Sequence, residues 1–388
     1  MANGAIATNK AAHSTATGHS MTASLSQRLS VLPTKTTQTL QLKRPIHDRQ
    51  PSGSTMRKVL HVGPCNAPGG MATVMKTLAE HPPDGWEAEL LPTYSSGGVW
   101  SKWKAYRSAR RLLKRRLAKP SSVDVVHFHV ASDWSWHRKE RLIGLVQDLE
   151  GSVVVHLHSG AFETWIGSRP RIQHRFRRLT ARPRTALVVL NDHWREKMSP
   201  YTDRIQSINN PLPPTIHLSQ SKRDSNHLLL LGRADPVKGH AFAESLVTLL
   251  RKTRPDLHLS MTGRTHSDVE GVKALGWVEV SEKQLLLNTA SVLLVPSTYE
   301  GQPMVALEAL ASGCPVVLSS HVPLPPKAAL IAQHNDMNDW LICVNTALDH
   351  PMDGSFLRSS LDGHGIETVQ ESWSLIYTDV GKRDNNAS

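Results

Sequence analysis

Two glutamates, Glu300 and Glu308, stand eight residues apart in a segment whose pattern predicts a strand, a turn and a helix. Pro303 falls near the first turn of that helix, and Gly313 supplies its stop. Eight residues of helix rise about 12 Å and turn the side chain by roughly 80°. Both carboxylates can therefore reach one crevice beyond a strand end. This spacing suits the two ends of one extended ligand better than the closer carboxyl pair of a glycoside hydrolase.

Three further motifs lie upstream, each at the end of a short apolar run. They are Gly69 and Gly70 after the run at 59–62, His158 at the end of the run at 153–158, and Gly232, Arg233 and Lys238 after the run at 228–231. Glycine permits close backbone approach, and the helix that Gly69 and Gly70 open favours anions at its N-terminus. Each motif by itself is equally well explained as an ordinary turn or a solvated polar residue. The evidence for a functional site is that the motifs occur together.

The glutamate segment resembles the E-x7-E signature of retaining, nucleotide-sugar-dependent glycosyltransferases of family 4, which have the GT-B fold. The resemblance extends through the upstream motifs in the family's order, from about residue 57 to residue 318. It implies an α/β protein with two Rossmann-like, doubly wound parallel-sheet domains facing a central cleft. One departure leaves the sugar preference open: the commoner Glu-Gly-Phe-Gly is Glu300-Gly301-Gln302-Pro303 here.

The resemblance implies that a hexose-type sugar moves from a UDP- or GDP-sugar to a glycan or lipid-linked acceptor, with retention of configuration. Surface polysaccharide or glycolipid biosynthesis is the expected context, by analogy. Because negative charge builds on the departing phosphate, Arg233 and Lys238 are assigned to the diphosphate. Glu300 and His158 are expected at the donor sugar, as the other catalytic residues. The expected substrate-binding residues are Gly69, Gly70, Gly232, Gly301, Gln302, Pro303, Met304, Val305 and Glu308.

No metal or other cofactor is expected, because the resemblance implies metal-independent catalysis and the nucleotide-sugar is a substrate. No Asp-x-Asp of the metal-dependent GT-A type is present. The sequence does contain two His-x-His pairs, His127 with His129 and His156 with His158, on strands that could be adjacent. Alternation along a strand puts both members of a pair on one face, so a metal site is geometrically open.

The formal net charge is +12, and two segments concentrate it without any acid. One runs from Lys102 to Lys119 and the other from Arg169 to Arg184. The first predicts a helix with an apolar stripe formed by Trp100, Trp103, Tyr106, Leu113 and Leu117. Two interpretations stay open: peripheral binding to anionic membrane, or a stripe packed in the core beneath solvated cations. Nucleic-acid binding is a weaker alternative because no nucleic-acid module is recognisable, and sugar-nucleotide epimerisation fits the motifs less well.

The chain of 388 residues is long enough for two domains. Residues 1–55 read as a disordered leader, with Met56 as an alternative start and a transit peptide as a third interpretation. Residues 56–212 are expected to form the N-terminal acceptor domain and 213–365 the nucleotide-sugar domain, with a helix in 366–388 crossing back toward the first. Three scattered cysteines and the absence of an apolar membrane span or signal-peptide core favour the cytoplasm, on or off the inner face of a membrane.

Overall fold

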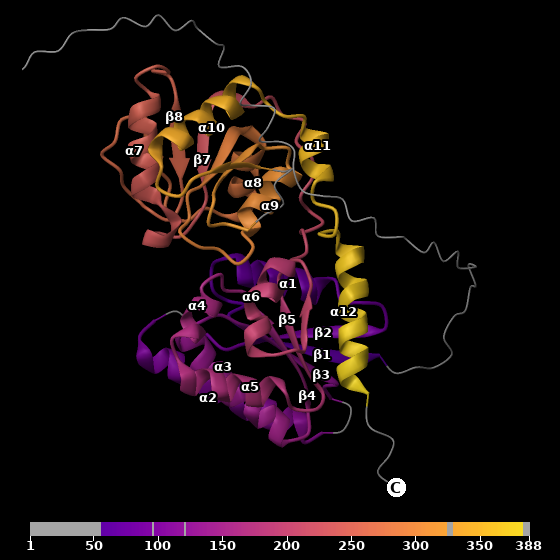
Figure 1. The fold of residues 1–388 in the computed structure, drawn as a ribbon. Helices are drawn as coiled ribbons and strands as arrows, with labels where there is room; N and C mark the ends of the chain where they lie inside the picture. The colour runs from indigo at the N-terminus through magenta and orange to yellow at the C-terminus, as the bar shows by residue number, and fades with distance from the viewer. Residues whose placement is uncertain (1–55, 95–96, 120–121, 324–328, 383–388) are drawn as a thin grey trace, which may run out of the picture. The chain divides into compact units, whose positions relative to one another are not determined.

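In a computed structural model, the fold is described for residues 56–382 apart from 95–96, 120–121 and 324–328. The predicted leader, 1–55, lies outside the described residues. Within the described part of the chain, no helix is both long enough and apolar enough to span a membrane. The described residues form two six-stranded parallel sheets with helices packed around them, so the predicted GT-B architecture is confirmed (Figure 1).

The first sheet has the strand order β2-β1-β3-β4-β5-β6, and all its pairs are parallel. Its strands are β1 (Arg57–Gly63), β2 (Trp86–Pro92), β3 (Val125–Val130), β4 (Ser152–Leu157), β5 (Thr185–Val189) and β6 (Ile205–Ser207). Its helices are α1 (Gly70–Glu80), α2 (Val99–Leu117), α3 (Trp134–Asp148), α4 (Phe162–Gly167), α5 (Pro170–Thr180) and α6 (Asp192–Met198), with a 3₁₀ turn at Ser199–Tyr201.

The second sheet has the order β12-β11-β10-β7-β8-β9, again parallel throughout. Its strands are β7 (Asp224–Leu230), β8 (His258–Met261), β9 (Val272–Ala274), β10 (Ala290–Val295), β11 (Val316–Ser319) and β12 (Leu330–Ala332). Its helices are α7 (His240–Leu250), α8 (Val280–Thr289), α9 (Met304–Ala311), α10 (Met337–Asp349) and α11 (Gly354–Ser359), with a 3₁₀ turn at Pro236–Lys238. The last helix, α12 (Ile366–Gly381), follows.

Central strands are buried on both faces, which explains why they read as near-continuous apolar runs. Every residue of β3 and of β4 is buried. Alternate residues serve different cores: Val126 and Phe128 pack with α2, α3 and α5, whereas Val125 and Val154 belong to the cluster that includes α1 and α12. Helices thus cover both faces of this sheet, as the doubly wound prediction requires.

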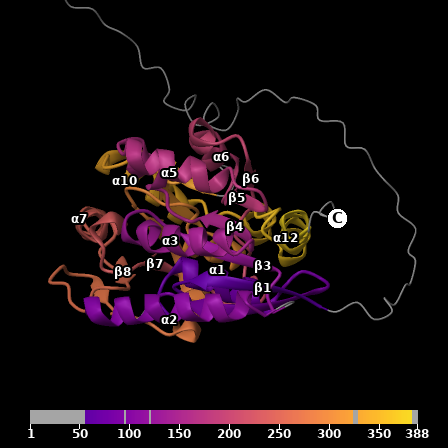
Figure 2. The ribbon, with the colours of Figure 1, turned by 90° about the horizontal axis from the view of Figure 1, so that it is seen from below.

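Helix α12 packs on the first sheet although it follows the second sheet in sequence (Figures 1 and 2). Trp373 and Tyr377 are its largest buried side chains, 0 % and 1 % exposed. The Trp373 ring lies 4.5 Å from the His127 ring on β3, and the Tyr377 hydroxyl is hydrogen-bonded to His127 Nδ1 at 2.8 Å. Helix α12 thus packs against β3, β4 and β5, while the division of the chain at residues 56–212, 213–365 and 366–388 stays a prediction.

Candidate active site

Glu300 lies in the loop between β10 and α9, and its carboxylate is held by two neighbours. Lys238 Nζ donates to Glu300 Oε1, and Ser297 Oγ donates to the same oxygen at 3.0 Å. The side chains of Lys238 and Glu300 are 23 % and 14 % exposed. Two of the predicted catalytic residues are thus an ion pair at the carboxyl ends of neighbouring strands, where open α/β sheets bind ligands.

Gly232 and Arg233 follow β7 directly. The Gly232 N–H donates to Thr262 Oγ1 at 2.9 Å, and a Cβ on Gly232 would lie 3.2 Å from Lys238 Cγ. The Arg233 side chain is exposed, and no described carboxylate pairs with it. An exposed guanidinium directly after a strand, with no carboxylate partner among the described residues, is suited to bind an anion.

Glu308 lies on α9 and is almost fully buried, 1 % exposed. Lys283 of α8 donates to both of its carboxylate oxygens, each at 2.8 Å. Burial raises the pKa of the Glu308 carboxyl, and the Lys283 charge acts in the opposite direction. Sequence reasoning singled out Glu308 but not Lys283, since a lysine in a helical segment carries no signal of its own.

Gln302 turns toward the segment between the two sheets. Its Oε1 accepts from the Asn210 N–H at 2.8 Å, and its Nε2 donates to Asn209 Oδ1 at 3.2 Å. The neighbouring Gly301 carbonyl accepts from Trp194 Nε1 of α6 at 2.5 Å. The residue that departs from the family pattern therefore anchors the Glu300 loop to this connecting segment.

Backbone from the two halves of the chain meets at Glu300. A Cβ built on Gly160, in the loop after β4, would lie 2.0 Å from the Glu300 carbonyl oxygen. A Cβ on Gly301 would lie 2.3 Å from the His158 carbonyl oxygen. Only glycine allows so close an approach. The structure thus brings the predicted residues His158, Glu300 and Gly301 together.

The glycine-rich loop before α1 lies beside the start of α9. Gly69 is the N-cap of α1 with φ 129°, a conformation that favours glycine. A Cβ on Gly70 would lie 3.2 Å from Met304 Cγ. Pro303 is the N-cap of α9, and Met304 is its first residue, followed by the half-buried Val305. The N-termini of two helices therefore lie near each other, which favours an anionic ligand.

The two His-x-His pairs lie on adjacent strands, as the sequence allowed. The register aligns His129 of β3 with His156 of β4, and it aligns His127 with His61 of β1. Burial lowers the pKa of His61 and of His158 to about 3, with Lys139 contributing at His158. Burial also lowers the pKa of His127, His129 and His156. These imidazoles are neutral. Two overlapping trios have ring nitrogens within 4.8 Å of one another: His61, His127 and His129, and His129, His156 and His158.

Lys139 of α3 is a second cation that sequence reasoning missed. It is 2 % exposed, its Nζ donates to Ser135 Oγ at 2.8 Å, and no described carboxylate pairs with it. Burial, then the charge of Arg138, lowers its pKa to about 7. Its helical phase, four residues before Ile143 and three after Trp136, places it on the buried face, which was the available signal.

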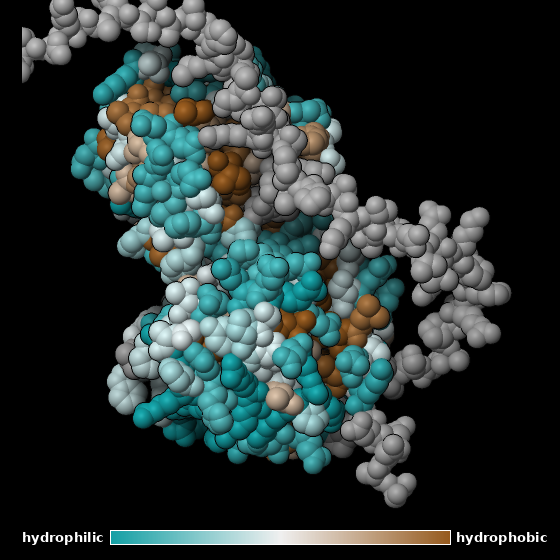
Figure 3. Space-filling view, viewed as in Figure 1, coloured by the Kyte–Doolittle hydropathy of each residue, from teal (hydrophilic) through white to brown (hydrophobic). Residues whose placement is uncertain are grey.

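The two basic segments form helical surface over the first sheet, and Figure 3 shows a hydrophilic face there. The predicted apolar stripe of α2 divides in two. Leu113 is buried and Tyr106 and Leu117 pack beside it, whereas Trp100 and Trp103 are 80 % and 48 % exposed. Core packing thus accounts for the second half of the stripe only.

Residues 225–349 match the family described as Glycosyl transferases group 1. Glycogen synthase of Mycobacterium tuberculosis is 27 % identical over 237 residues, which are 55 % of this chain and 56 % of that protein. Phosphatidyl-myo-inositol mannosyltransferase of Propionibacterium freudenreichii is 35 % identical over 112 residues, 28 % of this chain and 29 % of that protein. The chain thus spans about half the length, or less, of these relatives.

The fold is also found among solved structures. Sucrose-phosphate synthase from Thermosynechococcus elongatus superimposes with a TM-score of 0.58 at 16 % identity, over 84 % of this chain and 97 % of that one. At that identity the likeness speaks for the fold. The family match covers the second sheet from β7 to α10, and with it Arg233, Lys238, Glu300 and Glu308. The comparisons thus identify a Glycosyl transferases group 1 match at residues 225–349, in a chain that shares its fold with sucrose-phosphate synthase.

Proposed function

We propose that this protein transfers a hexose-type sugar from a nucleotide-diphosphate sugar, UDP- or GDP-linked, to a glycan or lipid-linked acceptor with retention of configuration. The observation that carries the proposal is the meeting of the His158–Gly160 backbone with Glu300 and Gly301, where Lys238 is paired with Glu300. Similarity to a glycogen synthase and to a mannosyltransferase supports the reaction class.

In this proposal the two cations stabilise the leaving diphosphate. Arg233 offers a planar fork of donors, and Lys238 offers a point charge that Glu300 now partly neutralises. A donor diphosphate would compete with Glu300 for Lys238 and free the carboxylate to accept from a sugar hydroxyl. Electrostatic stabilisation of this kind is usually the largest catalytic contribution, and here it requires no metal ion. Glu308 is proposed to accept from the ribose hydroxyls, using lone pairs that Lys283 leaves available.

The first test is thermal unfolding of the full chain with UDP, GDP, ADP and their sugar conjugates. A ligand that binds only the native state at 100 times its Kd stabilises by about 2.7 kcal/mol. We expect a rise in Tm with one nucleotide, lost in Arg233→Ala. Lys273→Ala, a change at an exposed lysine of β9, is the matched control. No response to any nucleotide would contradict the proposal.

The second test separates binding from chemistry. Glu300→Gln should retain nucleotide binding and lower transfer of sugar by about 100-fold or more, as removal of one transition-state contact does elsewhere. Transfer is measured as release of free nucleoside diphosphate in the presence of a glycan or lipid acceptor. Wild-type turnover in Glu300→Gln would remove Glu300 from the catalytic group.

We also propose that α2 binds to an anionic membrane surface and that the protein reaches its acceptor there. Trp100 and Trp103 pack edge to face at 5.8 Å, and the Arg107 guanidinium lies 4.6 Å from the Trp103 ring centroid. Exposed tryptophans beside cations are typical of interfacial helices.

Vesicle flotation tests this surface. Wild-type protein should float with anionic vesicles at low salt, and Trp100→Ser with Trp103→Ser should lower the bound fraction several-fold. Trp277→Ser, a change at another exposed tryptophan (58 %), should leave it unchanged. Equal flotation of both variants, or none of the wild type, would overturn the membrane proposal and leave the sugar-transfer proposal standing.

A further inference from the structure

Five histidines gather on one face of the first sheet, contributed by three adjacent strands. They are His61 on β1, His127 and His129 on β3, and His156 and His158 at the end of β4. They share the face that carries Val59 and Val125, which is the face covered by α12. Four are at most 1 % exposed, and His158 is half-buried. Five imidazoles in one buried place exceed what the proposed sugar contact requires, since that contact uses His158 alone.

The histidines form two hydrogen-bonded strings. In one, His61 Nδ1 lies 3.0 Å from His129 Nε2, and His129 Nδ1 lies 2.9 Å from His158 Nε2. In the other, the Tyr377 hydroxyl is bonded to His127 Nδ1, and His127 Nε2 lies 3.2 Å from His156 Nδ1. The second string ends at His156 Nε2, which is buried and has no hydrogen-bond partner among the described residues. A buried polar atom without a partner is costly and calls for an explanation.

We infer that His129, His156 and His158 form a binding site for one divalent transition-metal ion of the zinc class. One ring nitrogen from each residue lies within 4.8 Å of the other two. Tetrahedral zinc with bonds of about 2.0–2.1 Å holds its ligand nitrogens roughly 3.3 Å apart. The 2.9 Å separation of His129 Nδ1 and His158 Nε2 is therefore close to the required distance. Three imidazoles without a carboxylate favour zinc, copper, nickel or cobalt over magnesium or calcium.

The remaining two histidines fit the outer shell of such a site. With His129 Nδ1 on the ion, His129 Nε2 carries the proton and donates to His61. With His156 Nε2 on the ion, His156 Nδ1 donates to His127, and His127 Nδ1 donates to Tyr377. Metal-bound histidines usually donate their other N–H in this way, which fixes the tautomer and the ring orientation. One assignment of protons thus satisfies both strings and the orphaned nitrogen.

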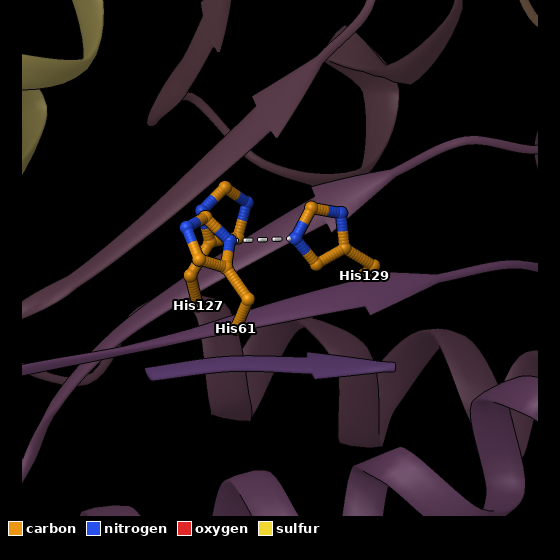
Figure 4. A group of neighbouring side chains, drawn as sticks. All are labelled: His61, His127 and His129. Carbon is orange, nitrogen blue, oxygen red and sulfur yellow. Dashed lines mark hydrogen bonds between the residues drawn. The ribbon is translucent and has the colours of Figure 1, made fainter. Parts of the chain in front are cut away.

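The other trio is a poorer candidate for the ligands. Figure 4 shows His61, His127 and His129, with the hydrogen bond that joins the first to the third. One His127 nitrogen is bonded to Tyr377, and the His127 ring is stacked on that of His129 at 4.2 Å and 12°, closer and more nearly parallel than the His129 and His158 rings at 5.1 Å and 26°. Stacked rings direct their nitrogens along parallel planes rather than toward one point. His61 and His127 therefore belong to the outer shell.

The ion would be a structural element next to the candidate active site. It would join the carboxyl ends of β3 and β4 and hold the His158 ring in one orientation, and the proposed leaving-group chemistry does not pass through it. His158 is half-buried, so we expect the ion to enter on that side and to take its fourth ligand there. Binding of the ion does not depend on the proposed sugar transfer, so each can fail separately.

Calorimetric titration of the chelator-stripped full chain with Zn²⁺, and the visible spectrum with Co²⁺, test the site. We expect one tight ion per chain, a tetrahedral Co²⁺ spectrum, and a rise in Tm with Zn²⁺. His156→Phe should weaken this binding at least 10-fold. His158→Asn should do the same, and because the half-buried His158 follows the carboxyl end of β4, this variant tests the site if the first one misfolds. His61→Phe should weaken it about 10- to 100-fold through the outer shell.

His266→Phe is the matched control, since the His266 side chain is 78 % exposed and belongs to neither string. It should bind Zn²⁺ like the wild type. Absence of a tight ion in the wild type, or unchanged affinity and stoichiometry in His156→Phe and His158→Asn, would overturn the inference. A Co²⁺ spectrum without tetrahedral character would do the same, because the inferred site is four-coordinate.

Discussion

At the scale of single residues, the candidate site depends on charges that are held away from water. Glu308 is the clearest case, because a nearly inaccessible carboxylate is matched by one ammonium. Breaking a buried ion pair on one side is more damaging than replacing both partners, since it leaves an uncompensated charge. Lys283 is therefore expected to be required to keep the buried Glu308 carboxylate charged and in place.

Lys283→Met should lower the free energy of unfolding by up to about 3 kcal/mol, the lower end for a broken buried pair because Lys283 is itself 22 % exposed. Lys283→Met with Glu308→Gln should recover a large part of this loss. Urea unfolding of the two single variants and the double variant measures the coupling. Simple additivity of the two changes would mean that the pair contributes nothing beyond its separate residues.

The buried Lys139 should make the free energy of unfolding depend on pH. Its pKa is about 7 in the folded chain and 10.5 ordinarily, so between these values the unfolded chain binds more protons. The free energy of unfolding should therefore rise with pH across this window, by about 2 kcal/mol from pH 7 to pH 9. Lys139→Met should remove that rise and be more stable than the wild type at pH 7. Parallel pH profiles of the two proteins would contradict a buried, unpaired ammonium.

The sequence could single out Glu300, Lys238 and His158 as candidates because each belongs to a motif that ends or follows an apolar run and resembles a family signature. It could not identify Lys283 or Lys139 as readily, because each is one polar residue inside a helix and its partner lies on another element or a turn away. The Gln302 contacts with Asn209 and Asn210 were equally out of reach, since they join residues about 90 positions apart. Residue types and spacing are enough to predict which charged residues are candidates for the site. Which of them form pairs depends on the tertiary structure.

At the scale of elements, eight of the twelve strands in the described part of the chain were predicted, and the four missed strands are β2, β6, β9 and β12. These four are the edge strands of the two sheets. Central strands are buried on both faces and read as apolar runs, whereas edges are partly exposed and mix polar with apolar residues. The hydrophobic sequence pattern is therefore weakest in edge strands, which pair with a neighbouring strand on one side only.

Helix α12 should be essential to the first sheet, and one pair of variants tests this. Trp373→Ala removes a side chain that is 0 % exposed and lies 4.5 Å from the His127 ring, so it should cost about 3–5 kcal/mol of unfolding free energy. Leu375→Ala, two residues away and 74 % exposed, should change stability by less than about 0.5 kcal/mol. Urea denaturation followed by circular dichroism measures both. Similar costs for the two would mean that α12 is not docked on this sheet.

At the scale of the whole molecule, the candidate site exists only where the loop after β4 meets the loop before α9. Neither sheet alone holds His158 and Glu300 together, and the contact depends on two glycines rather than on any charged pair. The exposed cations and tryptophans of α2 belong to the first sheet, while the proposed donor residues Arg233, Lys238, Glu300 and Glu308 belong to the second. Acceptor and donor functions are thereby expected on different halves of the chain, which is the arrangement that the resemblance to GT-B enzymes implied.

Gly160→Ala tests whether this meeting is required. The added Cβ would lie 2.0 Å from the Glu300 carbonyl oxygen and 2.3 Å from its carbonyl carbon, so the two loops must separate. Since a misplacement of about 1 Å at a catalytic group can cost 100-fold in rate, we expect a loss of transfer of that order. Gly144→Ala is the matched control, because a Cβ there meets nothing within 4 Å and alanine favours a helix interior. It should keep wild-type transfer and gain about 0.5–1 kcal/mol of stability. Wild-type transfer in Gly160→Ala would show that the loops need not touch, and the site would then have to be sought within one half of the chain.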